Sequence, residues 1–122
     1  MRLQARDWGE AAFTGITTIV FSRTMKQQDH PDVSVVSELN PDWVRALQTR
    51  NGKDIWLFGG SELFRSFLDS GHVDTVEVTV IPVLLGGGIP LLAPPYSPAR
   101  LGLLTHKVYR SGSVSLAYDV QN

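Results

Sequence analysis

Apolar and polar residues alternate along the chain in a way that predicts strands and helices in turn. β-Branched and aromatic residues fill positions 16–21, which indicates a strand, and a second short strand is expected at 33–36. Asn40 followed by Pro41 is typical of a helix start, because the asparagine side chain accepts hydrogen bonds from unpaired N–H groups and proline fits the first helical position. This helix is expected to end at the Asn-Gly pair 51–52.

A run of apolar residues at 55–58 is typical of a strand that is covered on both faces. Two glycines end this run. A second helix, with apolar residues at helical spacing, is then expected from Ser61 to the Ser-Gly pair 70–71. Valine at every second position of 75–80 predicts a further strand.

The tail contains two strand candidates, at 103–110 and 113–120, joined by a Ser-Gly pair, so a closing hairpin is expected. Strands that alternate with helices predict a mainly parallel sheet with helices on its faces. The expected fold class is therefore α/β: a three-layer α/β/α sandwich with a mostly parallel mixed sheet and a C-terminal antiparallel hairpin. Residues 3–12 are weakly helical, and a single domain is expected over 1–122.

Composition and charge narrow the classes of function. Hydrophobic residues make up 43% of the chain and charged residues 19%, which is ordinary for a globular protein. A net charge of −1 provides no basic surface for nucleic acid or a membrane, so a bound phosphate must be held by a few local donors. The lack of cysteine excludes thiolate metal sites and fits the cytoplasm. Prolines and glycines in the uncharged stretch 78–99 would break a membrane-spanning helix.

The segment from Phe58 to Leu63 carries the strongest indication of chemistry. Gly59 and Gly60 allow the backbone to approach a ligand closely, and the first turn of the following helix presents unpaired N–H groups at the positive end of its dipole. Such a turn suits a pyrophosphate. The alternative is a tight connection in which Ser61 caps the helix, and the pattern leaves both open. Glu62 would contact a ribose hydroxyl or complement the helix N-terminus.

Ser22, Arg23 and Thr24 follow directly on the strand expected at 16–21. A guanidinium between two hydroxyls suits a phosphate monoester, because arginine offers a forked, charged set of donors. The alternative is a solvated turn. The two groups are expected at the carboxyl ends of strands, which lie on one edge of a parallel sheet.

Other candidates carry less weight. The glycines at 86–88 would let a loop pass close to a flat ring or serve as the hinge of a covering loop. His72 follows a helix end, which favours a surface connection near the helix dipole over a metal site. No set of residues forms a catalytic dyad, a nucleophile elbow or a metal motif, so the catalytic residues are unknown.

Three blocks of the sequence, 54–64, 73–74 and 81–92, resemble the reductase domain that ends bifunctional riboflavin-biosynthesis deaminase-reductases, within the dihydrofolate reductase-like superfamily. The resemblance implies NADPH as the cofactor and hydride transfer to a pyrimidine or pterin-like ring. It implies that the glycine turn and its helix hold the pyrophosphate and that the Ser-Arg-Thr segment lies at the 2′-phosphate. The expected cofactor-binding residues are Ser22, Arg23, Thr24, Phe58, Gly59, Gly60, Ser61, Glu62 and Leu63.

The sequence departs from this family at its N-terminus. Family members begin with strands, a helix and a Gly-Arg-x-Thr motif that this chain lacks, and two of those strands flank the one expected here at 55–58. Without them, either the remaining strands close up, another chain supplies pairing, or the protein is longer. The reductase hypothesis therefore has a rival: a truncated, non-catalytic nucleotide-binding or assembly module that forms a homo-oligomer.

Overall fold

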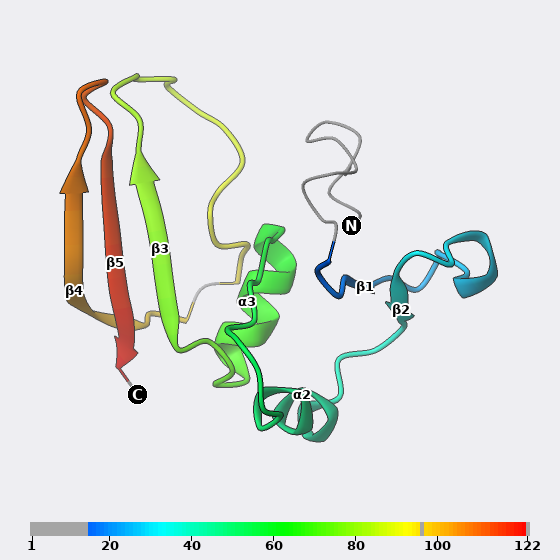
Figure 1. The fold of residues 1–122 in the computed structure, drawn as a ribbon. Coiled ribbons are helices and arrows are strands. Elements are labelled where there is room, and N and C mark those ends of the chain that lie inside the picture. The colour runs from blue at the N-terminus through cyan, green and yellow to red at the C-terminus, as the bar shows by residue number, and fades with distance from the viewer. Residues whose placement is uncertain (1–14, 96, 122) are drawn as a thin grey trace. The chain divides into compact units, whose positions relative to one another are not determined.

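The computed structural model of the chain describes residues 15–95 and 97–121 (Figure 1). The chain divides into two compact units, Met1–Gly60 and Ser61–Asn122. The weak helix expected at 3–12 lies outside the described residues. A single domain over the whole chain stays a prediction.

A short parallel pair of strands forms the sheet of the first unit. β1 (Ile19–Phe21) pairs with β2 (Ser34–Val36), with Val20 opposite Val35. The connection over 22–33 contains the 3-10 helix η2 (Gln27–Asp29) and is long enough for a parallel return. The Gln27 amide group donates to the carbonyls of His30 and Val33, at 3.0 and 2.7 Å, and its oxygen accepts from Val35 N–H at 2.9 Å. Both expected strands are confirmed, in shorter form.

Helix α2 (Pro41–Gln48) begins where the sequence predicts. The Asn40 side chain accepts from the backbone N–H groups of Asp42 and Trp43, at 2.9 and 3.3 Å. The helix buries Val44, which is 1% exposed, and Trp43 meets Phe21 edge-on with ring centroids 6.1 Å apart. The predicted end at 51–52 is wrong, because the helix ends at Gln48 with Thr49 as its C-cap.

The cap leads to a stability prediction. Asn40→Ala removes the acceptor for two N–H groups, so we expect the free energy of unfolding to fall by about 1 kcal/mol. Urea unfolding followed by circular dichroism measures this change. Asn51→Ala is the matched control, since Asn51 is exposed and lies beyond the helix. Equal effects of the two substitutions would contradict a capping role for Asn40.

The strand expected at 55–58 is not formed. The backbone of this segment has no regular structure, and it joins neither sheet of the described residues. Ile55 is 53% exposed and Trp56 73% exposed, so the segment is not covered on both faces. A strand needs neighbours to satisfy its N–H and C=O groups, and no described strand lies beside this one. The remaining strands have not closed up around it.

Helix α3 (Ser61–Asp69) opens the second unit and ends in a Schellman motif. Gly71 has φ 73°, His72 N–H donates to the Phe67 carbonyl at 2.9 Å, and Gly71 N–H donates to the Leu68 carbonyl at 3.1 Å. The imidazole of His72 packs against the Phe67 ring. His72 is only 9% exposed, so the expected surface position for this residue is wrong.

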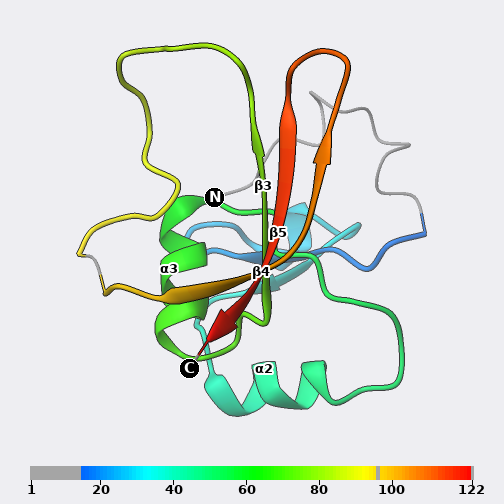
Figure 2. The ribbon, with the colours of Figure 1, turned by 90° about the vertical axis from the view of Figure 1, so that its left-hand side faces the viewer.

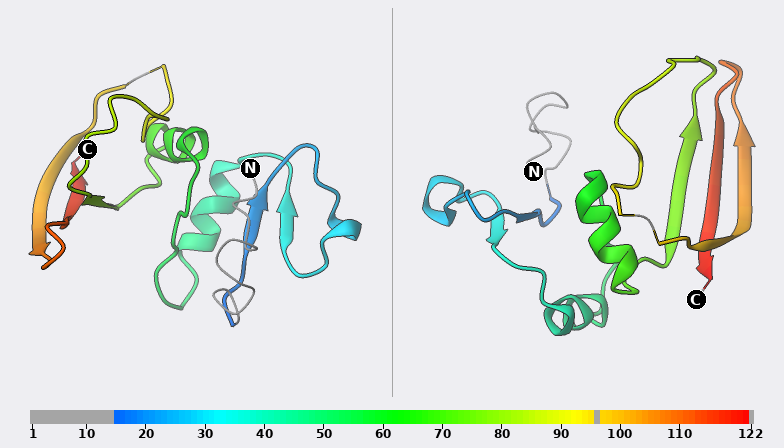
Figure 3. Two further views of the ribbon diagram at one scale, coloured as in Figure 1. Left: turned by 90° about the horizontal axis from the view of Figure 1, so that it is seen from above. Right: turned by 180° about the vertical axis from the view of Figure 1, so that it is seen from behind.

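Three antiparallel strands form the sheet of the second unit: β3 (Thr75–Val80), β4 (Arg100–Val108) and β5 (Val114–Gln121). Their order is β3-β5-β4, and they lie side by side in Figures 1 and 3. The α/β class and the closing hairpin are confirmed. The expected predominance of parallel pairing is wrong for the described residues, because β1–β2 is their one parallel pair and the expected central strand at 55–58 is missing.

A β-bulge at Leu104 keeps Leu101, Leu103 and Val108 of β4 on one face. The register shifts between Leu103 and Thr105, so Leu103 lies opposite Tyr118 and His106 opposite Leu116. Residues paired across a ladder share a face, and those on one side are nearly all apolar. This apolar sheet face consists of Val76, Val78, Val80, Leu101, Leu103, His106, Val108, Val114, Leu116, Tyr118 and Val120. On the opposite face the hydroxyls of Thr79 and Ser115 form a hydrogen bond of 2.8 Å.

The long connection from β3 to β4 is held to α3 near its far end. Ala93 is buried, and its N–H donates to the Ser61 carbonyl at 3.4 Å. The Arg65 guanidinium donates to the Pro94 carbonyl. Figure 2 shows the connection on the same side of the sheet as α3. The part of the connection over 81–91 is exposed throughout.

Candidate functional site

The first turn of α3 presents backbone N–H groups that no other described residue engages. The first N–H groups of a helix have no partner within it, and none of the hydrogen bonds of the described residues is donated by the backbone of Ser61, Glu62 or Leu63. The contact with Ala93 uses the carbonyl of Ser61 and leaves the N–H groups available. The helix has 9 residues, so its dipole places partial positive charge here.

None of the three side chains of this turn is fully buried. Ser61 and Leu63 are half-buried, whereas Glu62 is exposed. Ser61 is the first residue of the helix and not the residue before it, so the expected alternative of a Ser61 cap is wrong. Glu62 is the acidic residue of the first turn, where its charge complements the dipole.

The glycine turn at the end of the first unit directly precedes Ser61 in the sequence. Gly59 has φ 118°, a region that side-chain-bearing residues rarely adopt, so this position requires glycine. The Gly59–Gly60 peptide bond is cis. Phe58 is half-buried and meets Trp56 edge-on, with ring centroids 4.8 Å apart.

The turn after β1 holds the second predicted group. The Ser22 hydroxyl accepts from the N–H groups of Thr24 and Met25, at 3.2 and 3.0 Å, and therefore stabilises the turn. Ser22 N–H donates to the Val36 carbonyl at 2.9 Å. Arg23 and Thr24 are exposed. Of this group, Arg23 offers the charge that a phosphate needs.

The two predicted groups do not share one sheet edge. Ser22–Thr24 follow a strand of the β1–β2 sheet, but the segment before Gly59 is not a strand of that sheet. The contacts of Ser22–Thr24 run to Met25 and Val36, within their own turn and sheet. The prediction of a common carboxyl edge is therefore wrong for the described residues.

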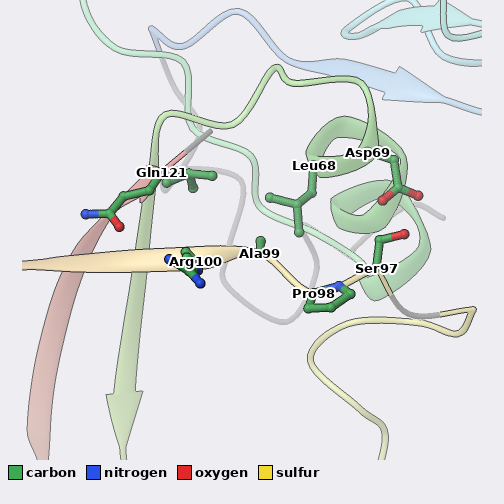
Figure 4. Close-up of a pocket in the computed structure, with 8 residues that line it drawn as sticks. Leu68, Asp69, Ser97, Pro98, Ala99, Arg100 and Gln121 are labelled. Atoms are coloured by element: carbon green, nitrogen blue, oxygen red, sulfur yellow. The ribbon is translucent and has the colours of Figure 1, made fainter.

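The second unit contains an open pocket that the sequence did not predict. It has a volume of about 420 Å³ and lies between the end of α3 and the ends of β4 and β5 (Figure 4). Leu68 and Asp69 come from α3, Arg100 from β4, and Val120 and Gln121 from β5. These residues are far apart in the sequence, so no local pattern could have revealed the pocket.

The part of the chain that the structure describes contains neither a metal cluster nor a membrane-spanning helix. Within 15–95 and 97–121 no three His, Cys, Asp or Glu side chains are placed to hold a metal ion. No helix in the same ranges is long and apolar enough to span a bilayer.

Solved structures share this fold. A structure of a putative riboflavin biosynthesis protein from Shewanella sp. PV-4 matches with a TM-score of 0.73 and 22% identity, covering 88% of this chain and 62% of that one. A pyrimidine reductase-like protein from Corynebacterium diphtheriae matches with a TM-score of 0.65 and 21% identity, covering 93% and 53%. At these identities the likeness establishes the fold alone.

Sequence comparison identifies the family. The model of the RibD C-terminal domain matches residues 5–115, so the chain belongs to this family. It is 33% identical over 99 residues to the uncharacterized protein YyaP of Bacillus subtilis, covering 81% of this chain and 52% of YyaP. It is 35% identical over 75 residues to YwjB of the same organism, covering 62% and 43%. The chain thus spans about half the length of these relatives, and the predicted resemblance is confirmed.

Proposed function

We propose that this protein is an NADPH-dependent reductase of a pyrimidine or pterin-like heterocycle. The observation that carries the proposal is the open first turn of α3, directly after a glycine pair, in a chain of the RibD C-terminal family. NADPH, when bound, supplies the hydride that such a reduction needs. The residues of the chain bind and orient it.

The pyrophosphate of the cofactor has candidate donors in the first turn of α3. The N–H groups of Ser61, Glu62 and Leu63 would hold the pyrophosphate, since no other residue in 15–95 or 97–121 engages them and they lie at the positive end of a helix. The backbone of Gly59 and Gly60 allows close approach of the same group.

The 2′-phosphate would be bound by Arg23, whose exposed guanidinium forms charge-assisted hydrogen bonds to phosphate oxygens. Ser22 keeps the turn in shape through its two accepted hydrogen bonds, and Thr24 adds a hydroxyl. Phe58, half-buried before the glycines, would line the cofactor site.

The substrate class rests on the neighbours. The Corynebacterium diphtheriae protein is described as pyrimidine reductase-like and the Shewanella protein as a putative riboflavin biosynthesis protein, which supports a nitrogen heterocycle here. We also propose that the chain forms a single domain with the three-layer arrangement of the predicted fold class. We propose further that it acts in the cytoplasm. No residue of the chain is assigned as the proton donor.

Titration of the full chain with both nicotinamide cofactors tests the proposal. We expect NADPH to bind about tenfold more tightly than NADH, a difference of about 1.4 kcal/mol, because only NADPH carries the 2′-phosphate for Arg23. Cofactor fluorescence at equilibrium measures both affinities. Equal affinities would contradict the 2′-phosphate assignment, and no binding of either cofactor would contradict the reductase proposal.

A second candidate function is a non-catalytic assembly module of the same fold. The exposed apolar side chains of the second unit favour it, among them Leu84 at 102% exposure. A homo-oligomer is expected in either case. NADPH binding without turnover of any heterocycle would favour the module, and hydride transfer would exclude it.

A further inference from the structure

The pocket of the second unit is lined by one acidic and one basic side chain. Asp69 is the last residue of α3, and Arg100 is the first residue of β4. Figure 4 shows their side chains on opposite sides of Leu68. Within the described residues, neither side chain forms an ion pair or a hydrogen bond. The two charges therefore line one cavity without neutralising each other.

The carboxylate of Asp69 lies where a helix favours a cation. The last carbonyl groups of a helix carry partial negative charge, so an acidic residue beside them is locally unfavourable. Helix α3 lies wholly within the described residues, and its last turn contains no basic residue that would offset Asp69. This side of the pocket therefore attracts a positively charged group.

Arg100 supplies the opposite charge at the end of the sheet. It lies opposite the uncharged Gln121 in the register of β4 and β5. The Asp119 carboxylate and the Gln121 amide fill the space that a side chain at Gly102 would need. Among the described residues no carboxylate pairs with the Arg100 guanidinium, so this group can bind the carboxylate of a ligand through two parallel hydrogen bonds.

The remaining wall and the size of the pocket suit a small molecule with an apolar body. Leu68, Pro98 and Val120 line the same cavity. Its volume of about 420 Å³ lies within the range of small-molecule sites, about 300–1,000 Å³. Asp69 would repel a simple anion, and Arg100 would repel a simple cation. A ligand that carries both charges, separated by an apolar body, satisfies the whole lining.

We propose that this pocket binds a small zwitterion whose ammonium and carboxylate groups lie at opposite ends of an apolar chain. Arg100 binds the carboxylate, Asp69 binds the ammonium group, and the chain between them contacts Leu68. Ser61 and Asp69 are the two ends of α3, about 12 Å apart at about 1.5 Å per residue, so this site is distinct from the proposed pyrophosphate site. Binding does not require NADPH, and it stands or falls separately from the proposed reductase function.

Titration of the isotope-labelled full chain with 6-aminohexanoate, followed by NMR, tests the site. We expect shifts of the backbone amides that line the pocket, namely those of Asp69, Ala99, Arg100, Val120 and Gln121. Hexanoate lacks the ammonium group and hexylamine lacks the carboxylate. Each should bind about fivefold more weakly, the size expected for a charge pair in contact with solvent. Norleucine, an isomer of 6-aminohexanoate with both charges at one end, should also bind about fivefold more weakly for the same reason.

Two variants assign the charges. Arg100→Gln should weaken 6-aminohexanoate about fivefold without weakening hexylamine, and Asp69→Asn should weaken it to the same extent without weakening hexanoate. Both side chains are exposed, so the substitutions leave folding intact. Arg110→Gln and Glu77→Gln are the matched controls, because they remove exposed charges of the second unit that do not line the pocket. Neither control should change any of the affinities.

Three results would overturn the proposal: no amide shifts at the pocket, equal affinities for 6-aminohexanoate, norleucine and hexanoate, or unchanged affinity in both pocket variants. Shifts confined to the first turn of α3 would place the ligand at the proposed cofactor site and refute a separate pocket. Adding NADPH to the same samples separates this proposal from the reductase function. Pocket binding in a chain that does not bind NADPH would contradict the reductase function alone.

Discussion

Arg23→Glu is expected to weaken NADPH binding about a hundredfold and to leave NADH binding nearly unchanged. Hydrogen bonds to charged groups contribute about 1.5–3 kcal/mol each, and the substitution replaces an attraction to the 2′-phosphate with a repulsion. Because Arg23 is exposed, its replacement should not alter the stability of the β1–β2 turn, which rests on Ser22. Cofactor fluorescence titration at constant ionic strength measures the two affinities.

The matched control is Arg50→Glu, which makes the same charge change at another exposed arginine of the first unit. It should shift the NADPH affinity by no more than a small factor through the changed net charge. If both variants lose NADPH affinity to the same extent, the effect is one of overall charge and Arg23 is not at the 2′-phosphate. If neither does, Arg23 lies outside the site.

Ser61→Pro is expected to weaken NADPH and NADH alike, by about tenfold to a hundredfold. Proline at the first helical position keeps the helix but has no N–H, so the substitution removes one donor from the proposed pyrophosphate site. Both cofactors contain the pyrophosphate, which is why both should be affected. The same titrations as above give the result.

Ser61→Ala separates the backbone from the side chain. It removes the hydroxyl and keeps the N–H, so its affinities should stay close to those of the wild-type chain. Circular dichroism should show equal helix content in both variants. Full cofactor affinity of a folded Ser61→Pro chain would place the pyrophosphate elsewhere, and loss of affinity in Ser61→Ala would assign the role to the hydroxyl.

Helix boundaries were predictable where one local interaction decides them. The start of α2 follows from Asn40, whose side chain satisfies N–H groups two and three residues ahead. The end of α3 follows from Gly71, which adopts a positive φ that few other residues tolerate. The end of α2 was less predictable, because the helix stops at Thr49 before the expected Asn-Gly pair.

The candidate site was predictable only in its parts. The sequence indicates the glycine turn, the helix after it and an exposed Arg23, and the structure has each of these features. Their common sheet edge was not predictable, because it required residues 55–58 to be a strand. The buried position of His72 and the pocket beside Arg100 also depend on residues brought together from distant parts of the chain.

Local sequence thus set the helix starts, the turns and the alternation of β3 and β5, because each depends on side chains within a few residues of one another. Tertiary structure decided that residues 55–58 do not form a strand. It also decided the antiparallel order β3-β5-β4 and the bulge in β4. A strand exists only where neighbouring strands supply hydrogen-bond partners for its backbone. A run of apolar residues does not indicate whether those neighbouring strands are present. The same reason leaves Leu84 in solvent, since hydrophobicity specifies that a side chain favours burial but not what covers it.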